Sequence, residues 1–381
     1  MTKFLAEKPR YLVADKFLLG AKPPPGITVE YLSTEPREAG RLASDLAYVN
    51  GEWLDLEHWR YWIGHRRPRD NAKLMAPEAI VSFKEAFVSP DNQIVTAAGR
   101  AIRSPYLGSG AYFEPIPAEE VVAEYNGTYG TALLRAVDYG HWLMHRIPRI
   151  ATLTEHAPGV PFLHSQINDK GVLARFGLTE DNVVRFPRSK QSTWAYVENL
   201  LVPSHLSRPG HQRVQDIHRL DRVVRQFTDG IVDDPTLPEL LYVARRPDDR
   251  RSGASNKDEM QEYFESLGFV TWYPIDDPIE RQIQHFRAAR VVVSEIGSQG
   301  LTSMFAGPDT TVIIITPAKS KGLSSQRVFR PTWRQWQRVV CEARFQGYAQ
   351  IVAATDTAYR SFDVDMDILT TAMESYPLRS W

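Results

Sequence analysis

Arginines gather in one short segment of the chain, directly after a run of apolar residues. Residues 240–244 have the β-branched and aromatic character of a buried strand, and Arg245 and Arg246 follow them. The loop beyond adds Arg250 and Arg251. A guanidinium presents planar, bidentate donors that match a phosphate. At the ligand edge of a sheet, these arginines would form a clamp for a pyrophosphate; the alternative is a solvated basic loop.

A glycine turn follows a second apolar run, which ends in Ser294 and Glu295. The turn is Gly297, Ser298, Gln299 and Gly300, and the start of an amphipathic helix and a further strand at 312–315 come after it. Strand, glycine turn, helix and strand form one turn of an open α/β sheet, in which backbone N–H groups and a helix N-terminus bind anions. Ser298 and Thr302 either cap this helix or bond phosphate oxygens.

Two side chains have the chemistry to accept a proton. Glu295 ends a buried strand, where a carboxylate is costly unless it is paired. It is either an acceptor for sugar hydroxyls, a general base, or the partner of a neighbouring arginine. His141 follows a turn that opens a helix, and a histidine pKa suits proton abstraction near neutral pH; the alternative is a capping or core histidine. His145 lies on the same helix face, but without an evident third ligand the pair predicts no metal site.

The bulk composition limits the class of protein. The chain has 381 residues, enough for two domains of ordinary size. Its 45 basic and 46 acidic side chains leave a net charge of -1, which gives no case for nucleic-acid or anionic-membrane binding. Cys341 is the single cysteine, so an intramolecular disulfide and a cysteine metal cluster are excluded. Without an apolar run that spans a bilayer and without a secretory signal, we expect a cytoplasmic protein.

The elements around these residues predict an α/β fold. In the second half, strands at 240–244 and 270–273 and the run ending at Glu295 alternate with helices at 256–267 and 278–288, which is typical of a parallel sheet. In the first half we expect a hairpin of strands 81–88 and 94–98, a helix over 139–156 kinked near Pro148, and strands at 160–163 and 183–186. The predicted domains are an N-terminal extension with one or two helices (1–75), two Rossmann-like domains (76–210 and 211–345) and closing helices (346–381).

Four stretches of the chain, taken together, resemble glycosyltransferase family 61. VDYGHWLMHRIPRI (137–150) is similar to the family's His-Trp helix, and AYVENLLVPS (195–204) to the segment that closes its first domain. LYVARRPDDRRSGASNKDEM (241–260) resembles the family's arginine and asparagine stretch. VVVSEIGSQGLTSMF (291–305) resembles its glycine turn, nearest to the bacterial form found in capsule and surface-polysaccharide clusters.

The resemblance implies the GT-B fold, in which two Rossmann-like domains face each other across a cleft. It implies an inverting glycosyltransferase that needs no metal or other cofactor. The enzyme would move a hexosyl or pentosyl group from a nucleotide sugar, a UDP-sugar before others, to a hydroxyl of a glycan or glycoconjugate. Asp363 and Asp365, which formally match a metal-diphosphate motif, are expected to cap a helix instead.

Under this hypothesis His141 is the preferred base, Glu295 is the second choice, and Arg245 stabilises the leaving diphosphate. The donor is expected to contact the arginine segment and the glycine turn, namely Arg245, Arg246, Arg251, Asn256, Ser294, Glu295, Gly297, Ser298, Gln299, Gly300, Leu301 and Thr302.

Departures from the family pattern motivate a second hypothesis. Ile296 stands where the family has a histidine, His145 where it has a carboxylate, and Lys257 where it has a glutamate. The second hypothesis is a catalytically degenerate protein that binds nucleotide sugars or polysaccharide; a third is a nucleotide-sugar epimerase of the same fold. Under each of these hypotheses, we expect the protein to lie in the cytoplasm, free or peripheral to the inner membrane.

Overall fold

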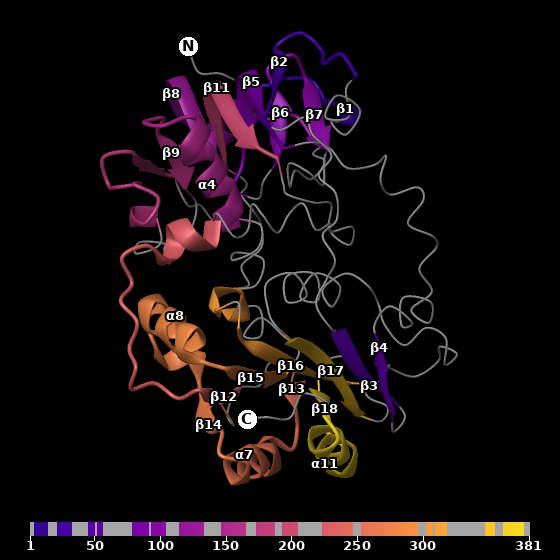
Figure 1. Ribbon diagram of the computed structural model, residues 1–381. Helices are drawn as coiled ribbons and strands as arrows, with labels where there is room; N and C mark the ends of the chain where they lie inside the picture. The colour runs from indigo at the N-terminus through magenta and orange to yellow at the C-terminus, as the bar shows by residue number, and fades with distance from the viewer. Residues whose placement is uncertain are drawn as a thin grey trace. The chain divides into compact units, whose positions relative to one another are not determined.

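In the computed structural model, the described strands and helices form two compact units. Unit 1 contains β1, β2 and the elements from β5 to β11, and unit 2 contains β3, β4 and the elements from β12 onward (Figure 1). The described residues are 4–13, 21–32, 45–49, 52–55, 78–90, 93–103, 114–132, 146–164, 173–186, 193–204, 223–246, 253–295, 302–307, 309–317, 347–354 and 361–376.

Unit 2 is built on a sheet with the strand order β14-β12-β15-β16-β17-β3-β4. Its neighbours are parallel from β14 to β3, and only the β3–β4 pair is antiparallel. The elements of unit 2 are β3 (Asp45–Val49), β4 (Glu52–Asp55), β12 (Leu240–Val243), β13 (Gly253–Ala254), α7 (Lys257–Ser266), β14 (Val270–Trp272), η4 (Pro274–Asp276), α8 (Ile279–Ala288), β15 (Val291–Glu295), η5 (Thr302–Phe305), β16 (Thr311–Pro317), β17 (Gly347–Ala354), β18 (Ser361–Phe362) and α11 (Met366–Glu374).

The parallel sheet of unit 2 confirms the pattern expected for the second half of the chain. Gly268 ends α7 with a φ of 87°, as its position in the sequence indicates. Pro278 is the N-cap of α8, whereas the expected helix 278–288 had it inside the first turn. Taken in chain order, the strands from β12 to β17 have the spatial order 2-1-3-4-5, which is a doubly wound arrangement.

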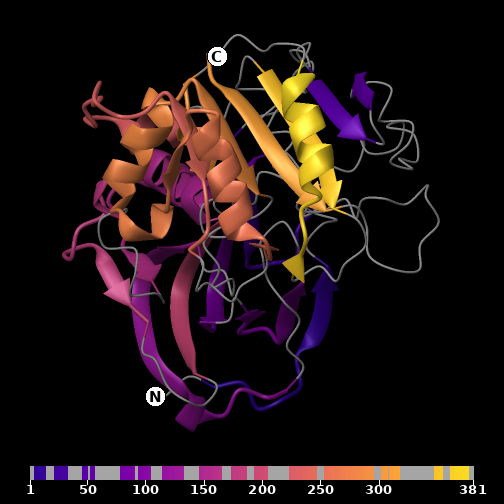
Figure 2. The same ribbon diagram turned by 90° about the horizontal axis from the view of Figure 1, so that it is seen from below.

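The core of unit 2 lies between this sheet and two helices. Phe264 and Met260 of α7 and Leu369 and Met373 of α11 pack against the same side of the strands, which carries Tyr242. Both helices therefore lie on one face of the sheet, and α8 lies on the other (Figure 1, Figure 2). Because both faces are covered, the strands are apolar throughout rather than alternating.

Unit 1 is built on a mixed sheet of nine strands with the order β1-β7-β6-β5-β11-β8-β9-β10, and β2 also pairs with β5. The elements of unit 1 are β1 (Arg10–Val13), β2 (Ile27–Tyr31), β5 (Ala79–Val88), β6 (Ile94–Thr96), β7 (Arg100–Arg103), η2 (Ala118–Glu120), β8 (Val121–Thr131), α4 (Ile147–His156), β9 (Phe162–His164), β10 (Val183–Arg185) and β11 (Trp194–Pro203).

Only one half of this sheet fits the predicted Rossmann-like pattern. The strands β11, β8, β9 and β10 are parallel, whereas β5 pairs antiparallel with β11, β6 and β2. The predicted hairpin of β5 and β6 is confirmed, and it explains the mixture. A turn as short as the one between Val88 and Ile94 can join only antiparallel strands, because a parallel pair needs a long crossover.

Residues 1–75 contribute strands to both sheets. β1 and β2 pair with β7 and β5 in unit 1, and β3 pairs with β17 in unit 2. The sequence indicated a separate extension with one or two helices, whereas every element described within these residues is a strand. Pairing at a sheet edge satisfies backbone groups that an isolated extension would expose to water. The domain boundaries inferred from the sequence stay predictions.

Pro148 lies in the first turn of α4 as the structure describes it, where no intrahelical N–H bond is lost and a φ near that of the helix is already fixed. Residues 139–145 of the expected helix lie outside the described residues, so the kink stays a prediction. α4 packs closely on β8: a Cβ at Gly130 would lie 2.2 Å from a methyl carbon of Leu153. Glycine at position 130 therefore allows the helix to approach the strand.

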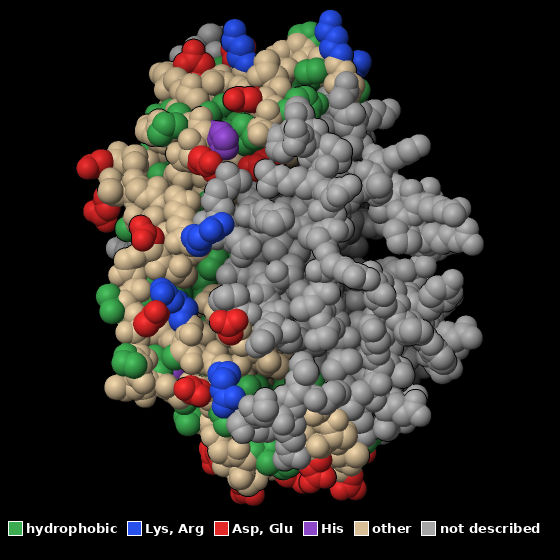
Figure 3. Space-filling view, viewed as in Figure 1, with side chains coloured by type: hydrophobic (Ala, Val, Ile, Leu, Met, Phe, Trp, Pro, Cys, Tyr) green, Lys and Arg blue, Asp and Glu red, His purple; other side chains and the backbone are tan. Residues whose placement is uncertain are grey.

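The described surface carries both signs of charge. Acidic and basic side chains are interspersed on the face drawn in Figure 3, in line with the even charge balance of the whole chain. Within the described residues, no helix combines the length and the apolar character needed to cross a membrane.

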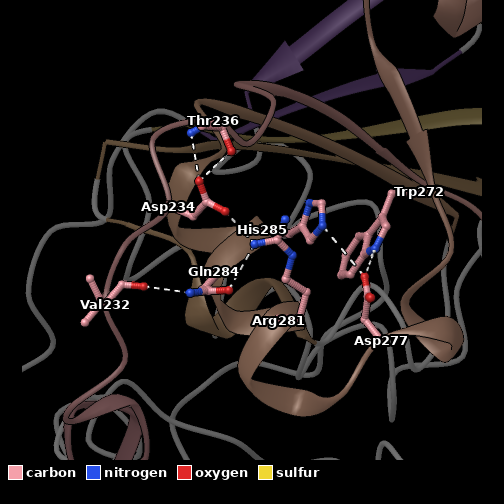
Figure 4. A network of polar contacts seen from close by, with 8 residues as sticks. All are labelled: Val232, Asp234, Thr236, Trp272, Asp277, Arg281, Gln284 and His285. Atoms are coloured by element: carbon pink, nitrogen blue, oxygen red, sulfur yellow. Dashed lines mark hydrogen bonds and ion pairs between the residues drawn. The ribbon is translucent and has the colours of Figure 1, made fainter.

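A polar network ties α8 to the segment that leads into β12 (Figure 4). Arg281 donates to Asp234 (2.6 Å) and to Gln284 (3.2 Å), and Gln284 donates to the carbonyl of Val232 (2.8 Å). Hydrogen bonds from Thr236 and from Arg281 hold the pKa of Asp234 well below its usual range. The network thus fixes the segment that enters β12.

His285 lies at the other side of this network. Its ring stacks on Trp272, with centroids 4.4 Å apart, and its Nε2 lies 3.7 Å from Asp277, which also accepts a hydrogen bond from the Trp272 indole (2.7 Å). Burial lowers the pKa of His285, and the charge of Arg281 lowers it further.

Acidification is expected to destabilise the protein in part through His285. Because its pKa is lower in the folded than in the unfolded chain (about 6.5), the unfolded chain binds the extra proton first, so stabilisation present above about pH 6.5 is lost below it. His285→Phe keeps a ring on Trp272 but cannot titrate. Its urea midpoint should fall less between about pH 7.5 and about pH 5.5 than that of the wild type; equal falls would contradict the assignment.

Candidate functional site

The candidate site lies at the carboxyl ends of β12 and β15. These strands are parallel neighbours, with Val243 paired to Ser294. In the chain β14 follows β12 and is added on one side of it, while β15 is added on the other, so the direction of winding reverses between β12 and β15. Open α/β sheets bind ligands in the crevice outside the strand ends at such a switch point. The prediction that the arginine segment and the run before the glycine turn share an edge is thus confirmed for the strands.

Glu295, the last residue of β15, is completely buried. Its Oε2 accepts a hydrogen bond of 2.6 Å from the backbone N–H of Ala254. The negative charge of Glu295 also acts on Tyr242: burial raises the pKa of this phenol well above its usual range, and the carboxylate raises it further. The structure therefore places Glu295 beneath the strand β13, facing the same layer as the buried Tyr242.

Arg245 and Arg246 differ in their surroundings although they are adjacent. Arg245 is half-buried, and its Cδ would lie 3.2 Å from a Cβ at Gly253. Arg246 is exposed and forms a two-point contact with Asp276, one arm of which measures 3.2 Å from Nε to Oδ2. A surface pair of this kind contributes little to stability. Of these two predicted phosphate ligands, Arg245 is thus the more buried one, and it lies against Gly253.

Asn256, a predicted donor contact, holds two distant parts of unit 2 together. Its Nδ2 donates to the carbonyl of Val364 and its Oδ1 accepts from the N–H of the same residue, both at 2.9 Å. Nδ2 also donates to Glu259 at 2.9 Å. Ser255 makes a short hydrogen bond to Asp363 beside this pair. The amide of Asn256 is therefore engaged by protein groups on both its nitrogen and its oxygen.

Of the two acidic residues expected to cap α11, Asp365 does so, whereas Asp363 accepts a hydrogen bond from Ser255. Asp365 is the N-cap of α11 and accepts a hydrogen bond from the N–H of Ile368 (3.1 Å). Among the residues that the structure describes, no group of histidine, cysteine, aspartate and glutamate side chains could hold a metal ion.

The residues around the glycine turn are only partly described. Ser294 is buried, and its hydroxyl donates to the carbonyl of Glu295 (2.9 Å). Thr302 is also buried and begins η5, a single 3₁₀ turn where the sequence predicted an α-helix. Gly307 and Pro308 follow at once, which explains why no α-helix continues there. His141, Arg251, Gly297, Ser298, Gln299, Gly300 and Leu301 lie outside the described residues.

Two arginines at the start of α4 in unit 1 are buried. Arg149 donates from Nε to the carbonyl of Pro203 (2.8 Å), at the end of β11, and Arg146 contacts the imidazole of His164, at the end of β9. The start of α4 is thereby fixed to the carboxyl ends of two parallel strands. Sequence reasoning missed His164 and, in unit 2, Gly253; only their positions at strand ends could have indicated them.

Comparison with known proteins finds a domain of the glycosyltransferase class in this chain. The family model of glycosyltransferase 61 matches residues 139–313. The matched span contains the strand ends with Arg245 and Glu295, and it includes nearly all of the four stretches that resemble the family in the sequence. A comparison with curated proteins found no match.

Proposed function

We propose that this protein is an inverting, metal-independent glycosyltransferase whose nucleotide-sugar donor binds unit 2 at the carboxyl ends of β12 and β15. The observation that carries the proposal is the meeting of Arg245 and Glu295 at the switch point of a doubly wound sheet, within a family 61 domain. The GT-B architecture, the UDP-sugar, the glycan acceptor and a cytoplasmic role in surface-polysaccharide synthesis are part of the same proposal and rest on the resemblance.

In the proposed reaction the acceptor hydroxyl attacks the anomeric carbon on the side opposite the diphosphate. A C–O bond to the acceptor forms while the bond from the anomeric carbon to the diphosphate oxygen breaks, and the configuration inverts. His141 takes the hydroxyl proton, as a base with a pKa near neutrality can. The diphosphate leaves with the bonding electron pair, and the guanidinium of Arg245 stabilises the charge that develops on it.

The second candidate is a protein that binds nucleotide sugars without turnover. One observation favours it: Lys257, which stands where the family has a glutamate, donates to the backbone carbonyl of Arg246 (3.0 Å) and so supports the arginine segment instead of carrying a carboxylate. A structural role of this kind is compatible with binding alone.

A ligand screen followed by product analysis tests the proposal. The full chain is heated with UDP, other nucleoside diphosphates and their sugar conjugates; a ligand at about 100 times its dissociation constant adds about 2.7 kcal/mol of stability. Nuclear magnetic resonance of the products of the stabilising donor then reports the anomeric configuration. A glycoside of inverted configuration is expected. Binding without turnover would favour the second candidate, an epimerised donor without glycoside would favour an epimerase, and no stabilisation by any nucleotide would contradict both binding proposals.

A further inference from the structure

The short strand β13 (Gly253–Ala254) lies against Glu295, beyond the end of β12 that carries Arg245 and Arg246. The carboxylate of Glu295 accepts the N–H of Ala254 at 2.6 Å, and β13 pairs with β18 as well. The described residues on either side of positions 247–252 thus lie at β12 and at this carboxylate.

Residue 253 has no room for a side chain between its backbone and the side chains of Glu295 and Arg245. A Cβ on residue 253 would lie 2.8 Å from Oε2 of Glu295 and 3.2 Å from Cδ of Arg245. Real Cβ atoms do not approach other atoms as closely as the first of these distances, and the close packing of a protein interior leaves little room to adjust. Both side chains therefore pack against the bare backbone of Gly253. A displacement of Gly253 from the place where Glu295 holds it would also displace the side chain of Arg245.

Solvent access separates two roles that the sequence left open for Glu295. A general base must come within hydrogen-bonding reach of the acceptor hydroxyl. Glu295 is 0% exposed, lies under β13 and faces the layer of Tyr242. A hydroxyl could reach its Oε2 only after residues 253 and 254 had moved away.

We propose that Glu295 is a positioning residue: through Ala254 and Gly253 it holds the side chain of Arg245 in place to bind a diphosphate, and it takes no proton from the acceptor. This inference rests on the proposed function and names the role of one of its residues. A buried carboxylate that accepts a backbone N–H is well suited to this task, because such a charge-assisted hydrogen bond is short and strong.

Three variants of the full chain separate the positioning role from the base. Glu295→Gln keeps an oxygen that accepts the N–H of Ala254, Glu295→Ala removes it, and Gly253→Ala displaces the contact without altering the carboxylate. Glu239→Ala is the matched control. Glu239 directly precedes β12, so it lies at the amino ends of the strands, opposite the candidate site, and it pairs with Arg290 on the surface. Titration calorimetry with inorganic pyrophosphate and with UDP measures binding, and steady-state assays with the identified donor separate KM from kcat.

We expect Glu295→Ala and Gly253→Ala to weaken pyrophosphate and UDP binding by about tenfold or more, and to raise KM for the donor correspondingly, as loss of one ordering hydrogen bond implies. Glu295→Gln and the control should stay within about threefold of the wild type, and the pH profile of kcat should not change. A fall of kcat by about a hundredfold or more in Glu295→Gln, with UDP binding intact, would overturn the proposal in favour of a base. Folded Glu295→Ala with wild-type binding would overturn it as well.

Hydrogen exchange keeps the inference testable if no nucleotide binds. The amide of Ala254 is expected to exchange faster in Glu295→Ala than in the wild type, and at the wild-type rate in Glu295→Gln. Unchanged protection in Glu295→Ala would refute the positioning contact itself. Altered protection without binding of pyrophosphate or UDP to any form would leave the contact standing and contradict the proposed function.

Discussion

Replacing Arg245 by alanine is expected to lower the rate of sugar transfer by about a hundredfold, which corresponds to about 3 kcal/mol of lost transition-state stabilisation. The guanidinium lies at the carboxyl end of β12, against Gly253, where the proposal places the diphosphate. Charge on the leaving diphosphate grows as the glycosidic bond to it breaks. The loss should therefore appear chiefly in kcat, measured with a donor identified by the ligand screen.

A matched variant distinguishes this effect from a general loss of positive charge. Arg290 directly precedes β15, so it lies at the amino ends of the strands of the same sheet. There its Nε lies 3.3 Å from Oε2 of Glu239. Arg290→Ala should keep wild-type activity and a free energy of unfolding within about 0.5 kcal/mol of the wild type, as surface substitutions usually do. Arg245→Ala should remain folded, as its urea unfolding curve would show. Wild-type turnover in Arg245→Ala would remove this arginine from the mechanism.

The part of the site that could be predicted from the sequence is the part that depends on chain order. A strand of apolar residues, a helix closed by Gly268 and a second strand predict parallel neighbours whose carboxyl ends meet, and β12 and β14 do so. The next helix, α8, leads in the same way to β15, which pairs with β12 on its other side. Side-chain surroundings depend on segments far apart in the chain. Asn256 hydrogen-bonds to Val364, more than a hundred residues away, and no local pattern of either segment indicates that pairing.

The first half of the fold shows the same limit more strongly. The hairpin of β5 and β6 was predictable because its turn is short and local. The pairing of β3 with β17 was not, because residues near 45 join strands near 350 and their own pattern is equally compatible with an independent segment. Glu295 is an intermediate case: the sequence indicated that a carboxylate at the end of a buried strand needs a partner, and the structure supplies the N–H of Ala254.

Substitution of Phe264 by alanine is expected to destabilise unit 2 by about 3–5 kcal/mol, the usual cost of removing a large aromatic side chain from a core. Phe264 is completely buried on α7. Its ring stacks on Tyr242, with centroids 4.5 Å apart, and meets Phe269 at 5.6 Å. Alanine would leave a cavity between α7 and β12, the strand that leads to Arg245.

Val270→Ala is the control for this prediction, because Val270 begins the neighbouring strand β14 but is 48% exposed, and its truncation should cost no more than about 0.5 kcal/mol. Urea unfolding of the full chain, followed by tryptophan fluorescence, compares both variants with the wild type. Trp272 lies in β14 and reports on unit 2. A loss below about 1 kcal/mol in Phe264→Ala would mean that α7 does not pack on β12 as described. If the loss is as large as expected, binding of UDP should restore part of it, because a ligand that binds only the folded unit raises its stability.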